Sequence, residues 1–90
     1  MITTNDINVI DRETISYIDV YGNTYQFETW DPMTLSELED AKSQFALILN
    51  LLIVSPSRSI EILIDSPSRS IERHMLLNGF YGIADVYKSK

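Results

Sequence analysis

Most residues that could do chemistry in this chain are carboxylates, and they are concentrated near the N-terminus. Nine of the thirteen Asp and Glu residues lie within residues 1–40, together with Arg12 as the only basic residue, so this region has a net charge of −8. Residues 41–90 carry a net charge of +2.

The predicted positions of these acidic groups suggest phosphate mimicry. Residues on one side of a strand repeat at about 6.6 Å, and diagonal cross-strand neighbours lie about 7 to 8 Å apart. Carboxylates on a strand or first helical turn can therefore stand at intervals comparable to those between DNA phosphates. The candidate partner-binding residues are Asp11, Glu13, Asp19, Glu28, Asp31, Glu37, Glu39 and Asp40.

The sequence lacks the residues that nucleophilic catalysis, metal binding or a phosphate-binding loop would need. A relay of Ser66, His74 and Asp65 would lie within or just before one helix, and nothing supplies an oxyanion hole. No three metal ligands converge at helical spacing, and the chain has no cysteine. No glycine-rich phosphate loop is present. We therefore expect no enzymatic activity, no metal and no cofactor.

Composition indicates one globular domain over residues 1–90. The chain is 44% hydrophobic and 10% aromatic, too apolar for an acidic disordered tail. Its net charge of −6 repels phosphates, so direct binding to nucleic acid is not expected. The longest apolar run, residues 45–54, is short of the roughly 20 residues that span a bilayer. With no signal sequence at the start, we expect a cytoplasmic protein without a membrane partner.

Residues 14–30 predict a β-hairpin, because they are rich in β-branched and aromatic types around Gly22 and Asn23. Gly22 at the first central position favours a two-residue type II′ turn. The resulting register pairs Tyr21 with Thr24, Val20 with Tyr25, Ile18 with Phe27 and Ser16 with Thr29. One face of this hairpin, with Ile18 and Val20, is mostly apolar and is expected to face inward. The other face mixes carboxylates with Tyr17 and Tyr21, with Trp30 at its far end. Residues 7–10 predict either a further short strand or an extension of the first one.

Thr34 and Glu37 have the spacing of a capping box that begins a helix. After Phe45 this helix is apolar on nearly all sides, so it needs a second partner besides the sheet. That partner is either the second helix or another subunit. For a homodimer, the candidate interface residues are Phe45, Leu49 and Leu52.

The rest of the chain alternates strand and helix. Residues 59–65 predict a strand, and Asp65 or Ser66 caps a helix that begins with Pro67 and ends at Asn78 and Gly79. Residues 81–87 predict the last strand. The expected fold is α+β in the order ββαβαβ, a two-layer structure in which two helices cover one face of a four-stranded sheet.

The apolar helix at 45–54 and the segment Asn78-Gly79-Phe80-Tyr81-Gly82-Ile83-Ala84-Asp85-Val86-Tyr87 resemble the Arn anti-restriction proteins of T-even phages, inhibitors of the McrBC restriction endonuclease. The size, acidity and lack of cysteine are also similar. This resemblance implies a homodimer whose carboxylates imitate DNA phosphates and occupy the DNA-binding site of a host nuclease or other DNA-binding protein.

Two hypotheses follow. The first is a phage-type inhibitor that acts as a DNA mimic inside the host cell. The alternative is a host-defence antagonist, similar to an anti-CRISPR, or an adaptor that binds a protein partner through the aromatic hairpin face with Tyr17, Tyr21 and Trp30.

Overall fold

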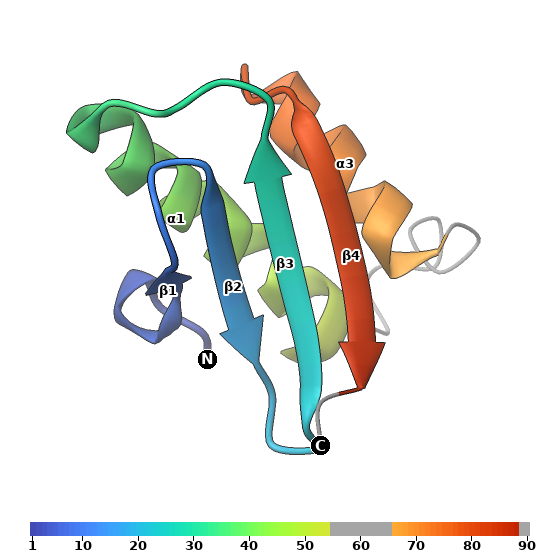
Figure 1. The fold of residues 1–90 in the computed structure, drawn as a ribbon. Coiled ribbons are helices and arrows are strands. Elements are labelled where there is room, and N and C mark those ends of the chain that lie inside the picture. The colour runs from blue at the N-terminus through green and yellow to red at the C-terminus, as the bar shows by residue number, and fades with distance from the viewer. Residues whose placement is uncertain (55–65, 89–90) are drawn as a thin grey trace.

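A computed structural model describes residues 1–54 and 66–88 as a two-layer α+β fold (Figure 1). Four antiparallel strands form one sheet in the order β1-β2-β3-β4, and helices α1 and α3 cover one of its faces. The predicted α+β class is thus confirmed, but the predicted order ββαβαβ is not, because the predicted strand at 59–65 lies outside the described residues and the fourth strand of the sheet is β1, Asn8–Val9. The elements are η1 (Thr4–Asp6), β1 (Asn8–Val9), β2 (Thr14–Ile18), β3 (Asn23–Thr29), α1 (Leu35–Leu49), the π-helical turn η2 (Asn50–Val54), α3 (Pro67–Leu77) and β4 (Gly82–Lys88).

The predicted register of the β2–β3 hairpin was wrong by three residues. Tyr17 lies opposite Tyr25, and Ile15 lies opposite Phe27. The connecting turn comprises residues 19–22, and Gly22 keeps the expected positive φ of 85° at its last position. Because a shift by an odd number exchanges the two faces of a strand, Ile15 and Tyr17 face the helices in place of Ile18 and Val20.

The predicted starts of both helices and the predicted end of the second helix are confirmed. The Thr34 hydroxyl accepts from the Glu37 N–H, and the Glu37 carboxylate accepts from the Thr34 N–H, which completes the capping box. The Ser66 hydroxyl accepts from the N–H of Arg69, with Pro67 at the first helical position. Gly79 follows α3 with a φ of 89°.

The core lies between the sheet and the helices, and it contains residues that were assigned to a dimer interface. Phe45 and Leu49 are both fully buried within the chain, as members of this core. Their assignment to an interface was wrong, because a side chain with no exposed surface has none to bury against a second copy. Leu52 is half-buried and packs on the same core. Helix α3 packs against α1, and His74 Nε2 lies 3.0 Å from Gln44 Oε1 across this contact.

The last strand, β4, pairs antiparallel with β3 over its whole length, from Asn23 opposite Lys88 to Thr29 opposite Gly82. It forms one edge of the sheet. Among residues 1–54 and 66–88, none of the helices has the length and apolar character to cross a bilayer.

Candidate functional site

Two acidic segments that are distant in sequence meet at one end of the sheet, the upper end in Figure 1. One is the turn between β1 and β2, and the other connects β3 to α1. The N–H of Thr29 donates to the carbonyl of Glu13 at 2.7 Å, and the N–H of Met33 donates to the carbonyl of Arg12 at 2.8 Å. The Thr29 hydroxyl also donates to the carbonyl of Asp31 at 2.7 Å. The backbone thus fixes the two segments side by side.

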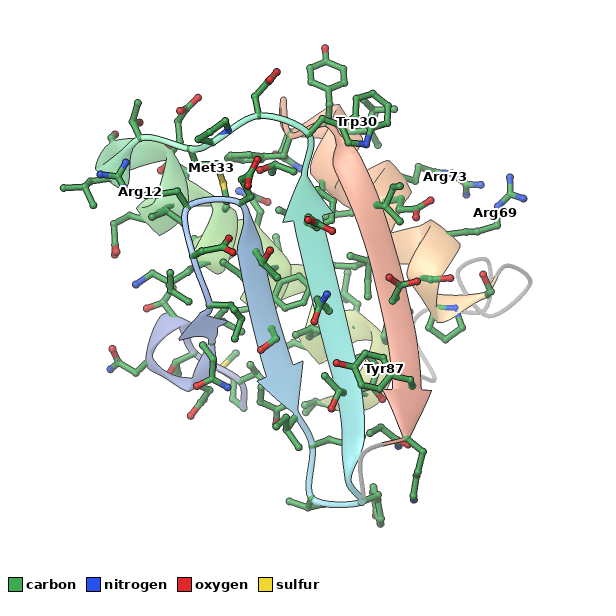
Figure 2. All side chains as sticks on the ribbon, in the orientation of Figure 1. Arg12, Trp30, Met33, Arg69, Arg73 and Tyr87 are labelled. Carbon is green, nitrogen blue, oxygen red and sulfur yellow. The ribbon has the colours of Figure 1, made fainter. Side chains whose placement is uncertain are left out.

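Arg12 lies in the same segment as Asp11 and Glu13, but its side chain binds a backbone carbonyl. Its guanidinium donates to the carbonyl oxygen of Met33 at 2.8 Å, and Figure 2 shows both residues at this end of the sheet. The arginine therefore serves to join the two segments through a hydrogen bond to backbone.

The carboxylates at this end are open to solvent. We define the acidic end as Asp11, Glu13, Asp31, Glu37, Glu39 and Asp40. Glu13 is half-buried and the others are exposed. Asp31 and Glu37 line the same shallow hollow, of about 150 Å³.

Besides Glu37, whose carboxylate caps α1, two members of the acidic end have local partners. Asp11 accepts from the N–H of Glu13 at 2.8 Å. Glu39 forms an ion pair with Lys42 at 2.7 Å. Both side chains remain exposed, so these contacts orient the carboxylates without removing them from the surface.

Glu28, another predicted residue, lies on the uncovered face of the sheet, opposite Thr14 on β2 and Ile83 on β4. It is exposed. It thus extends the acidic surface from the end of the molecule onto this face.

Asp19 does not belong to this surface, and its assignment to the partner-binding set was wrong. It lies in the β2–β3 turn, at the opposite end of β2, and is 8% exposed. Its carboxylate accepts from the N–H groups of Tyr21 and Asn23, the Asn23 amide and the Tyr25 hydroxyl, at 2.9 to 3.1 Å. Burial raises the pKa of Asp19, but these hydrogen bonds outweigh it and hold the pKa below its usual value.

The predicted aromatic hairpin face was also wrong. Tyr17 packs against Tyr25 on the side of the sheet that the helices cover, with 6.3 Å between ring centroids. Tyr21 lies in the β2–β3 turn, and Trp30 lies at the other end of the hairpin. The three side chains therefore do not share a surface.

The residues that bring the two segments of the acidic end together were not predicted from the sequence. Thr29 and Met33 bind residues that precede them by 16 and 21 positions, and no local pattern marks such contacts. In the part of the chain that the structure describes, no three His, Asp or Glu side chains are grouped so that they could hold a metal ion.

Comparison of the chain with protein-family models, with curated proteins and with solved structures found no match.

Proposed function

We propose that this protein is an acidic DNA mimic, an inhibitor that occupies the phosphate-binding surface of a DNA-binding protein. The observation that carries the proposal is the meeting of the 11–13 and 31–40 segments at one end, where Thr29 and Arg12 join them. A partner that grips phosphates with Lys and Arg would meet carboxylates already held in place.

Pre-organisation supports this mode of binding. Because hydrogen bonds to backbone fix both segments, little conformational entropy is lost when the partner binds. Opposite charges on the two surfaces accelerate encounter, and exposed carboxylates keep their charge until contact. The proposed partner is a restriction endonuclease of the McrBC type, the target that the resemblance to Arn proteins implies. A homodimer would have to form through surface residues other than Phe45 and Leu49.

The test compares two triple variants with the same net charge. The first, Asp11→Asn/Asp31→Asn/Glu37→Gln, neutralises the acidic end and keeps the acceptor that Glu37 supplies to the capping box. The control, Asp6→Asn/Glu72→Gln/Asp85→Asn, removes three charges elsewhere. Both change the net charge from −6 to −3, so a difference between them reports the position of the charges.

The readout is inhibition of DNA cleavage by a McrBC-type endonuclease. We expect the acidic-end variant to inhibit at least about tenfold more weakly than the original protein, and the control less than about threefold. Equal losses in both variants would contradict the proposal, because they would assign the effect to net charge alone. Circular dichroism checks that both variants are folded.

A further inference from the structure

A groove of about 480 Å³ runs between α3 and the edge strand β4, and its lining differs in charge from the acidic end. Figure 2 shows Trp30 at one end and the side chains of Arg69 and Arg73 extending from the outer side of α3. Its lining contains two arginines, Arg69 and Arg73, one carboxylate, Glu72, and the large apolar side chains of Trp30, Leu76, Tyr81 and Ile83.

The apolar part of the groove contains two aromatic residues that a backbone hydrogen bond joins. The N–H of Trp30 donates to the carbonyl of Tyr81 at 3.1 Å, which keeps the two aromatic residues together. Trp30, Tyr81, Leu76 and Ile83 are all at least half exposed. Such a group of large apolar side chains on a small protein is typical of an interaction site.

The polar part of the groove lies along β4. Glu72 of α3 accepts from the N–H of Ala84 at 2.8 Å, so this amide points away from β3 and toward α3. Amides of an antiparallel strand alternate in direction, and the N–H of Gly82 therefore points the same way. Gly82 is required here, since a Cβ would lie 2.1 Å from the carbonyl oxygen of Glu28.

The groove has the length of a short extended peptide. Arg69, Arg73 and Leu76 follow one another at helical spacing, and seven residues of helix rise about 10 Å. That is the length of roughly three residues of extended chain. Arg69 and Arg73 line the groove from α3, with their side chains extending outward from this helix, and Trp30 lies at one end.

We propose that this groove binds a short acidic segment of a partner protein in an extended conformation. Carboxylates of the segment pair with Arg69 and Arg73, and an apolar side chain between them packs on Trp30 and Leu76. The site differs in chemistry from the proposed DNA mimicry, because it uses cations and aromatic residues, although it adjoins the acidic end at Tyr81.

Other ligand classes fit the groove less well. A small molecule is normally enclosed over most of its surface, whereas these walls are exposed. A single-stranded nucleic acid could stack on Trp30, but its phosphates would continue past the groove toward Asp31, which is exposed. A short peptide keeps its few carboxylates beside Arg69 and Arg73.

Trp30 is the only tryptophan in the chain, so its fluorescence reports directly on the groove. The probes are a blocked hexapeptide that alternates glutamate and leucine, the same peptide with lysine in place of glutamate, and a single-stranded oligothymidylate. We expect a saturable fluorescence change with the acidic peptide alone, with half-saturation below about 1 mM.

Two charge-reversal variants complete the test. Arg69→Glu/Arg73→Glu should weaken binding of the acidic peptide at least about tenfold, and Lys42→Glu/Lys88→Glu, with the same net charge, less than about threefold. The proposal is overturned if the acidic peptide gives no saturable change, if the lysine peptide or the oligothymidylate binds as well, or if both variants lose the same affinity. The comparison of peptides uses the unmodified protein and does not depend on how the variants fold.

Discussion

Asp19 carries the same charge as the carboxylates of the acidic end but has a structural task. Buried in the β2–β3 turn, it accepts hydrogen bonds from two backbone N–H groups, the Asn23 amide and the Tyr25 hydroxyl. Asp in a turn commonly binds the backbone two residues on, as Asp19 does with Tyr21. A sequence pattern cannot separate this role from surface display, because the Tyr25 contact depends on the register of the hairpin.

Replacing Asp19 should destabilise the protein while leaving inhibition by the folded fraction unchanged. Asp19→Ala leaves the buried Tyr25 hydroxyl and three partly buried N–H donors of Tyr21 and Asn23 without their charged acceptor, at a cost of about 1.5 to 3 kcal/mol in the free energy of unfolding. Urea denaturation at pH 7 measures this, with Asp85→Asn as a control expected within about 0.5 kcal/mol of the original protein. A loss for Asp19→Ala no larger than that of the control would contradict the assignment.

The lowered pKa of Asp19 also predicts a pH dependence. Because the folded-state pKa lies below the unfolded one, near 3.8, the stabilisation is complete above that value and is lost as pH falls through the folded pKa. The difference in unfolding free energy between the original protein and Asp19→Asn should therefore shrink from pH 5 down to about pH 2. A constant difference over this range would contradict the pKa shift.

Tyr25 provides an alkaline counterpart. Burial, followed by the hydrogen bond to Asp19 and its charge, raises the pKa of Tyr25 to about 12. The stability that the neutral phenol provides is present below the unfolded pKa of 10.0 and is lost as pH rises through the folded value. In an absorbance titration, Tyr25→Phe should remove a phenol that ionises near pH 12. If the variant instead lost a phenol that ionises near pH 10, the raised pKa of Tyr25 would be contradicted.

At the scale of elements, the predicted helix starts are confirmed, because they depend on residues close together in the sequence. The predicted strand register, which depends on more distant residues, was wrong. The capping box at Thr34 and the Ser66-Pro67 start of α3 involve neighbours in sequence, so residue types at a fixed spacing predict them. The hairpin register failed because Gly22 suggested a two-residue turn, whereas the hydrogen bonds of Asp19 stabilise a longer one. The pairing of β4 with β3 joins residues more than fifty positions apart, and no local pattern encodes it.

Gly82 supplies a prediction at this scale. A methyl group there would lie 2.1 Å from the carbonyl oxygen of Glu28 and 2.9 Å from the ring of the buried Phe27, and neither can move away easily. We expect Gly82→Ala to lower the free energy of unfolding by about 2 to 3 kcal/mol and to disturb the pairing of β3 with β4. Gly79→Ala is the comparison, because its methyl group meets no atom within 4 Å. Only the strain of the positive φ should lower its free energy of unfolding, by about 1 kcal/mol. Similar losses at both positions would contradict the steric account.

At the scale of the whole molecule, charge is separated over the surface. The acidic end lies at one end of the sheet, and α3 carries Arg69 and Arg73 at the β4 edge. The concentration of acid in residues 1–40 was evident from the sequence. Its assembly into one end was not, because that depends on Thr29 and Arg12, whose partners are distant in sequence.

This separation predicts a strong effect of salt on inhibition. Binding that rests on several charge contacts should weaken at least about tenfold when the salt concentration rises from roughly 50 to 200 mM. The acidic-end triple variant should respond less steeply than the Asp6→Asn/Glu72→Gln/Asp85→Asn control. Inhibition constants measured over a salt series give the slopes, and identical slopes for the two variants would contradict the assignment of binding to the acidic end.

The most direct test of the central claim is competition with DNA. Inhibition of the endonuclease is measured at a series of concentrations of the duplex substrate, with the original protein. If the acidic end occupies the phosphate-binding surface, the concentration for half-inhibition rises in proportion to the duplex once the enzyme is near saturation. A half-inhibition concentration that is independent of the duplex would contradict DNA mimicry.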